Sequence, residues 1–225
     1  MNDIKFMCLG GCCASIYTLG EMRVPGPVDN LHSLNGLETI KVIFNKELEN
    51  EFFSENSILE RRKLDKRMID NVGLDSESHW CEYETLFKHY RMNHNDPTKE
   101  NVQEELKKRI HTLYDFIDNI KNEKNNYLIY ALCQYDFKDG KFNMEQFSKG
   151  IKILKENGVL DKTFFLGTRS KENTWYHFYN NNFRNNKNYF EVELLSKGDK
   201  LKESREKAKE DFISFLNRRK ILTKD

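Results

Sequence analysis

Two adjacent cysteines, Cys12 and Cys13, follow a double glycine near the start of the chain. The preceding residues, 4–9, have strand character, and the residues that follow can form a helix. A cysteine at such a turn lies beside free backbone N–H groups and the positive end of the helix dipole. This setting lowers the pKa of a thiol and offers donors to an oxyanion. We therefore predict that Cys13 is a nucleophile, with Gly10, Gly11 and Cys12 forming the turn and the oxyanion site.

Two other interpretations of this turn stay open. Cys12 is the rival nucleophile, because adjacent side chains at the start of a helix point in different directions. Cys13 is otherwise a buried structural thiol, since cysteine is among the residues most often buried. Cys8 lies within the predicted strand, so we expect it in the core.

A thiol nucleophile needs a base, and imidazole is the usual one. The chain has six histidines. His94 lies in a polar loop before a predicted helix, His89 in a segment that can be extended, and His32 just after a proline-rich loop. Asp29 or Asn95 would then orient the imidazole. For each histidine the alternative is an ordinary surface residue, and the residues alone leave the choice open.

The residues give little indication of a metal or a nucleotide. There is no Cys-x-x-Cys pair, and the histidine spacings do not fit a helical pair of metal ligands. The glycine turn lacks the G-x-G-x-x-G spacing that lets a pyrophosphate approach. We therefore expect no metal and no cofactor, apart from an acyl donor such as acyl-CoA if the protein is a transferase.

The elements that would position these residues alternate between buried strands and amphipathic helices. Predicted strands cover residues 4–9, 127–133, 163–166 and 189–195, and the longer predicted helices cover residues 37–48, 102–120, 144–156 and 200–219. The continuous apolar run 127–133 is typical of a strand covered on both faces. This order predicts a single α/β domain over residues 1–225, a three-layer sandwich with a mostly parallel sheet.

Two stretches do not fit the alternation. Residues 24–30 contain two prolines and are predicted to be a shaped loop. Residues 51–97 show no clear period and are predicted to be an irregular insertion, in which residues 79–81 and 86–90 are short strands or extended connections.

Ligand sites in open α/β sheets form beyond the carboxyl ends of the strands. The segment 134–136 follows one predicted strand, and the segment 167–169 follows another. We therefore expect Gln134 and Arg169 to contact substrate beside the Cys13 turn.

Composition excludes some classes of function. The 37 basic and 36 acidic residues nearly cancel, which argues against a dedicated nucleic-acid binder or a polybasic membrane binder. The number of cysteines is odd, at five, and we find neither an export signal nor an apolar segment of membrane-spanning length. We therefore expect a cytoplasmic protein that acts on a small-molecule, glycan or peptide acyl substrate, without nucleic acid or membrane as a partner. The oligomeric state is left open.

These motifs resemble those of a family of bacterial and viral proteins described as papain-like cysteine peptidases of unknown function. That family opens with a pattern like Ser-Leu-Gly-x-Asn-Cys, followed by a helix containing arginine and then Pro-Phe-Asp-Trp. Residues 8–13 correspond to the first motif, with Cys12 in place of the asparagine. Residues 27–30 correspond to the last motif, with Val28 and Asn30 in place of the two aromatics.

The resemblance implies a Cys–His site with Cys13 as nucleophile, His94 as base and Asp29 as third member. Arg23 matches the arginine of the family pattern, and with Asn30 it would belong to the substrate site. The implied activity is that of a peptidase or hydrolase that forms a thioester. An O-acyltransferase acting on a carbohydrate hydroxyl uses the same chemistry. The two lost aromatics favour a third alternative, an inactive glycan- or protein-binding module, and fold-level analogy does not choose among the three.

Overall fold

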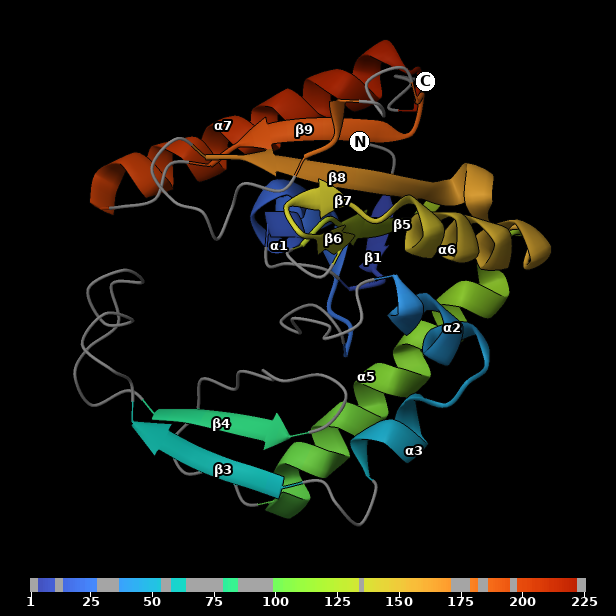
Figure 1. Cartoon of the computed structure of the whole chain (residues 1–225), viewed down its shortest axis with the longest axis vertical. Coiled ribbons are helices and arrows are strands. Elements are labelled where there is room, and N and C mark those ends of the chain that lie inside the picture. Colours follow the sequence, from blue (N-terminus) through green and yellow to red (C-terminus); the bar gives the residue numbers. More distant parts are fainter. Residues whose placement is uncertain are drawn as a thin grey trace.

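A parallel sheet forms the centre of the protein. The computed structural model describes residues 4–10, 14–27, 37–53, 58–63, 79–84, 99–133, 136–170, 179–181, 186–194 and 198–221. The strands of the main sheet are β1 (Lys5–Cys8), β2 (Arg23–Val24), β5 (Asn126–Ala131), β8 (Thr163–Arg169) and β9 (Tyr189–Glu193). Their order is β2-β1-β5-β8-β9, and every neighbouring pair is parallel (Figure 1). The protein therefore has an α/β fold, as the sequence predicts.

Helices cover both faces of this sheet. They are α1 (Ala14–Leu19), α2 (Glu38–Phe44), α3 (Leu48–Phe52), α5 (Lys99–Asn119), α6 (Met144–Glu156) and α7 (Gly198–Arg218), with short 3-10 turns at η1 (Gly20–Met22) and η3 (Leu160–Lys162). Side chains of α2, α5 and α6 share one hydrophobic cluster with the sheet, and side chains of α1 and α7 share another. The described elements thus form three layers (Figure 1).

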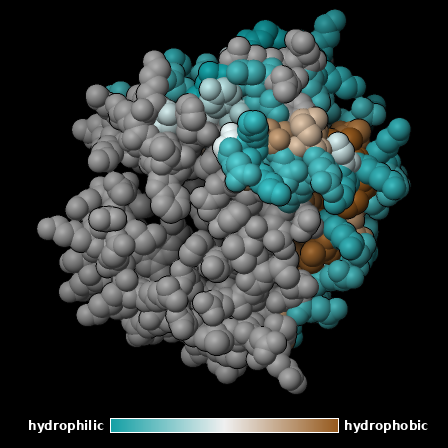
Figure 2. Space-filling model, in the orientation of Figure 1, coloured by the Kyte–Doolittle hydropathy of each residue, from teal (hydrophilic) through white to brown (hydrophobic). Residues whose placement is uncertain are grey.

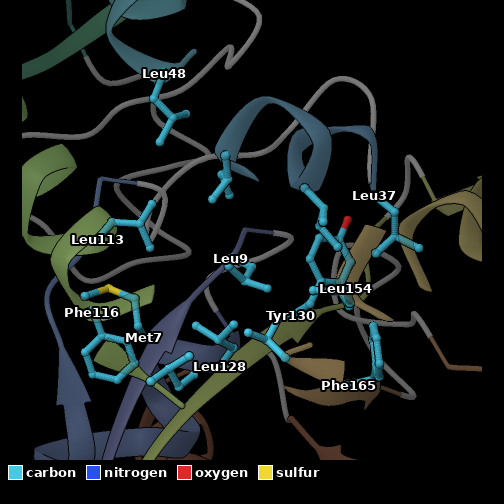
Figure 3. Close-up of a cluster of buried hydrophobic side chains, with 14 of the residues drawn as sticks. Met7, Leu9, Leu37, Leu48, Leu113, Phe116, Leu128, Tyr130, Leu154 and Phe165 are labelled. Atoms are coloured by element: carbon cyan, nitrogen blue, oxygen red, sulfur yellow. The ribbon is translucent and has the colours of Figure 1, made fainter. Parts of the chain in front are cut away.

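Strand β5 shows why its sequence is apolar throughout. Leu128 and Tyr130 belong to the cluster beneath α2, α5 and α6, while Ile129 and Ala131 belong to the cluster beneath α1 and α7. Successive side chains of a strand point to opposite faces, so a strand covered on both sides needs apolar residues at every position. Figure 3 shows the first of these clusters, with Tyr130 among the leucines of the strands and helices.

The predicted helix over residues 37–48 ends early, at Phe44, and a second helix, α3, begins at Leu48. Lys46 has a φ of 59°, which is a left-handed conformation that no α-helix continues through. The amide N–H of Glu47 donates to the carbonyl of Val42 (3.0 Å), and the Tyr114 hydroxyl accepts the amide N–H of Leu48 (3.0 Å) where α3 begins. The prediction of one continuous helix is wrong at this point, because the spacing of hydrophobic residues gives no indication of a single left-handed residue between two helices.

Short strands account for the other differences. The sequence predicts a loop at Val24, but Arg23 and Val24 pair with Phe6 and Met7 at the edge of the sheet. Strands β6 (Phe137–Lys138) and β7 (Lys141–Phe142) form a hairpin that the hydrophobic pattern does not indicate. Part of the predicted irregular insertion is also regular, since β3 (Ile58–Lys63) pairs with β4 (His79–Glu84) in antiparallel fashion, apart from the main sheet (Figure 1).

The described surface is mostly hydrophilic in the view of Figure 2, with smaller hydrophobic areas on the side of α2 and α6. Among the described residues, Met144 is the large hydrophobic side chain that is exposed, at 50%. None of the helices in the described part of the chain combines the length and the apolar character needed to cross a bilayer.

Candidate functional site

The order of the strands creates a switch point between β1 and β5. Strand β2 lies on one side of β1 and β5 on the other, so the direction in which the chain winds across the sheet reverses there. Both strands run in the same direction, with Cys8 opposite Ile129. In open α/β sheets, the crevice outside the carboxyl ends of two such strands is where ligands bind. The candidate site is therefore the carboxyl edge of the sheet at this position.

Gly10 begins the turn at the end of β1 and is joined to β5. Its carbonyl oxygen accepts the amide N–H of Ala131 (3.2 Å). The residue before it, Leu9, donates its amide N–H to the carbonyl of Ile129 (2.8 Å). The φ of Gly10 is 116°, a conformation that residues with side chains rarely adopt. A Cβ atom on Gly10 would lie 3.5 Å from Thr39 Oγ1 and 3.9 Å from Tyr130 Cε2. The turn is thus packed between α2 and β5.

Cys8 connects the same turn to the start of α1. Its Sγ atom lies 3.3 Å from the hydroxyl of Ser15 and accepts the amide N–H of Gly10 (3.4 Å). Cys8 is only 1% exposed, in agreement with its prediction as a core residue. The thiol therefore serves to hold the turn rather than to meet a substrate.

Asp136 is a buried carboxyl group just beyond the end of β5. It is 1% exposed. Its Oδ1 accepts the hydroxyl of Tyr130 (3.0 Å), and its Oδ2 accepts the amide N–H of Cys133 (2.8 Å). Burial raises the pKa of Asp136 to about 7, although hydrogen bonds from Cys133, Tyr130 and Leu37 counteract the rise. A carboxyl group that titrates near neutral pH at a switch point is a candidate functional group.

The sequence predicts that Asp136 lies just beyond a strand but does not indicate a role for it. The order of residues along the chain shows where β5 ends, and it therefore identifies the segment that contains Asp136. It does not show that the backbone of Leu37, from a distant segment, forms a hydrogen bond with the same carboxyl group, or that the folded chain buries this group and so raises its pKa.

Arg169 ends β8 at the same edge of the sheet, within a polar cluster. Its guanidinium forms an ion pair with Glu191, donates to Asn181 Oδ1 (3.2 Å) and lies over the ring of Tyr179, 3.8 Å from the ring centroid. The hydrogen bond with Glu191 raises the pKa of Arg169. Because Glu191 already matches this charge, an anionic substrate group would have to compete with Glu191 for the guanidinium.

The remaining predicted site residues divide into two groups. Arg23 lies on the edge strand β2 at the level of Phe6, two residues before Cys8, and is half-buried. The others lie outside the described residues: Gly11, Cys12, Cys13, Asp29, Asn30, His94 and Gln134, together with the alternatives His32, His89 and Asn95. Their roles stay predictions.

Within the described ranges, no group of three or more His, Cys, Asp or Glu side chains is arranged to hold a metal ion. In comparisons with known protein families, curated proteins and solved structures, nothing matches this chain. The family resemblance drawn from the motifs therefore also stays a prediction, and the candidate site rests on the fold and on its own residues.

Proposed function

We propose that this protein is a cysteine-dependent acyl-transfer enzyme in which Cys13 is the nucleophile. The observation that supports the proposal is the switch point between β1 and β5. The described part of the chain leaves β1 through Gly10 at this point and resumes at Ala14 with α1, so Cys13 belongs to the connection between them. A nucleophile in that connection would meet a ligand bound where open α/β sheets bind their ligands.

The proposed reaction has two steps. The Cys13 thiolate attacks the acyl carbon and forms a carbon–sulfur bond. The bond between the acyl carbon and the leaving group breaks, and His94 passes the proton of the thiol to the leaving group. The O–H group of the acceptor then attacks the thioester, His94 takes its proton, and the carbon–sulfur bond breaks. Asp29 would orient the imidazole, and the backbone N–H groups of residues 11–13 would bind the oxyanion.

The acceptor decides the class of enzyme. Water gives a peptidase or another hydrolase, whereas a carbohydrate hydroxyl gives an O-acyltransferase with a donor such as acyl-CoA. Arg23, Asn30, Gln134 and Arg169 are the proposed substrate contacts. The mechanism needs a reduced thiol, which fits the cytoplasmic setting expected from the sequence.

Labelling with an electrophilic thiol reagent at neutral pH, mapped by peptide mass spectrometry, tests the nucleophile. Cys8 and Cys133 are each 1% exposed, so they should contribute little background. We expect Cys13→Ala to abolish labelling of the peptide that contains residues 12 and 13, and Cys12→Ala to leave most of it. Equal labelling of the wild type and both variants would exclude Cys13 as the nucleophile.

The base and the alternative function are tested in the same assay. We expect His94→Ala to slow labelling at neutral pH, and the control His89→Ala to leave the rate unchanged. A Cys13 pKa well below the ordinary value of about 8.5 supports catalysis, while a pKa near 8.5 favours the inactive binding module. Release of an activated acyl ester, with and without added sugar, then separates hydrolysis from transfer.

A further inference from the structure

Asp136 joins four segments of the chain around the switch point. Its carboxyl group holds the hydroxyl of Tyr130 on β5 and the amide N–H of Cys133 just after β5. The backbone of Leu37, at the start of α2, forms a further hydrogen bond with it. The backbone carbonyl of Asp136 accepts the amide N–H of Asn143 (2.8 Å), which caps the start of α6.

Tyr130 extends this network to the turn after β1. Its ring lies against Gly10, and its hydroxyl contacts both carboxyl oxygens of Asp136, at 3.0 and 3.2 Å. Figure 3 shows Tyr130 with Leu9 and Leu37 in the same layer. Burial raises the pKa of Tyr130 well above its ordinary value, so the hydroxyl keeps its proton and remains a donor. The carboxyl group is therefore linked through one rigid ring to the segment that leads to Cys13.

We propose that Asp136 is a positioning residue of the Cys13 site, which holds the turn at Gly10 and the start of α2 at a fixed distance from β5. This proposal rests on the proposed function. Asp136 does not face solvent, so it acts through Tyr130 and the backbone rather than on substrate.

The protonation state of Asp136 changes the network. The ionised carboxylate accepts every hydrogen bond offered by its neighbours, whereas the protonated carboxyl group becomes a donor at one oxygen and loses acceptor capacity there. The titratable groups that face the carboxyl group are Tyr130 on β5 and Cys133 just after it, and Leu37 at the start of α2 forms a backbone hydrogen bond with it. Among the described residues, no Lys or Arg contributes to the shift of its pKa. The turn should therefore be held most firmly above about pH 7.

Backbone NMR of the full chain over a pH series tests the proposal directly. We expect the amide signals of Gly10, Leu37 and Cys133 to shift together with a midpoint near pH 7. Asp136→Asn should abolish this shared transition. Tyr130→Phe keeps the ring but removes a hydrogen bond that lowers the pKa, so it should move the midpoint to higher pH. Tyr127→Phe is the matched control on the same strand and should leave the midpoint unchanged.

Two further readouts use the same variants. The first is the labelling rate of Cys13 divided by its thiolate fraction, which is measured from ultraviolet absorbance. This ratio should rise through pH 7 in the wild type. In Asp136→Asn it should not change with pH, and above pH 7 it should be about tenfold lower than in the wild type.

The second readout is stability. The folded chain keeps a proton on Asp136 up to about pH 7, whereas the unfolded chain releases it near the ordinary value of 3.8. The free energy of unfolding should therefore fall as the pH rises through this interval, and less so in Asp136→Asn.

The outcomes separate the two proposals. If the three amide signals show no shared transition in the wild type, or keep it in Asp136→Asn, the positioning role is excluded, whatever Cys13 does. The positioning role is also excluded if Tyr127→Phe moves the midpoint as far as Tyr130→Phe does. If the transition depends on Asp136 but Cys13 is not labelled, the acyl-transfer proposal fails and the link between Asp136 and the turn stands.

Discussion

The Tyr189 side chain lies across the backbone of Gly167 on the neighbouring strand. Its hydroxyl accepts the amide N–H of Asn180 (3.0 Å) and donates to Glu191 (3.1 Å), the same carboxylate that pairs with Arg169. Burial raises the pKa of Tyr189, so this hydroxyl stays protonated. The absence of a side chain at Gly167 thus permits the arrangement that orients Arg169.

We expect Gly167→Ala to destabilise the protein by about 1–3 kcal/mol, the usual cost of overpacking a well-filled site. A Cβ atom at this position would lie 2.9 Å from Tyr189 Cζ and closer still to its hydroxyl. The ring could move away only by breaking the two hydrogen bonds of that hydroxyl. Chemical denaturation of the variant and the wild type measures the difference.

The control is a double-mutant cycle with Tyr189→Phe, which removes the atom nearest to the new Cβ. The two residues are in contact, so their effects should not be additive, and Gly167→Ala should cost less in the Tyr189→Phe background. Equal costs in both backgrounds would show that the Tyr189 hydroxyl is not what excludes a side chain at Gly167.

At the scale of elements, the β6–β7 hairpin connects Asp136 to the cap of α6. Its turn consists of Asp139 and Gly140, with φ values of 52° and 73°. Two residues with positive φ form the turn type that matches the twist of a hairpin, and Asp-Gly is one of its preferred sequences. Next to it, the Asn143 side chain accepts the amide N–H of Gln146 (3.1 Å) and caps α6. The hairpin therefore controls where the chain enters α6 after Asp136.

Asp139→Ala should lower the free energy of unfolding by about 1 kcal/mol, because alanine is strained in the left-handed conformation. Asp139→Asn should be nearly neutral, since asparagine tolerates that conformation. Thermal or chemical unfolding of the two variants provides the comparison. A loss of equal size in both would mean that the carboxylate of Asp139, rather than the shape of the turn, is responsible.

At the scale of the whole molecule, stability is centred on three strands. Strands β1, β5 and β8 have a hydrogen-bonded neighbour on each side, while β2 and β9 lie at the edges of the sheet. Two clusters of buried side chains, one on each face, enclose these central strands. The carboxyl ends of β1 and β5, where the candidate site lies, are thus in the most firmly held part of the sheet.

Native-state hydrogen exchange should rank the strands in the same way. We expect the slowest amides in β5, including those of Leu128 and Ile129, and faster exchange in the two-residue strand β2, because edge strands open without disrupting the core. Equal exchange rates for Val24 and Ile129 under native conditions would contradict this ranking.

The sequence by itself determined the α/β class and most of the long elements. The run 127–133 covers β5 except for its first residue, Asn126, and the predicted helix over residues 144–156 has the same bounds as α6. Strands buried on both faces and helices buried on one leave a periodic pattern that can be read from residue types alone. The hairpin at Asp139-Gly140 also had a local signal, which hydrophobic periodicity overlooks because each of its strands has only two residues.

The tertiary structure decided the rest. Strand β2 exists because Arg23 and Val24 pair with the backbone of β1. Lys46 adopts a left-handed conformation between α2 and α3, and the hydroxyl of Tyr114, from the distant helix α5, accepts the first amide N–H of α3. The pKa of Asp136 likewise depends on the folded structure, which buries its carboxyl group and brings the hydroxyl of Tyr130 and the backbone of Leu37 within hydrogen-bond distance of it. Periodicity records which face of an element is apolar, whereas a pKa, a register or a switch point depends on which distant residues meet.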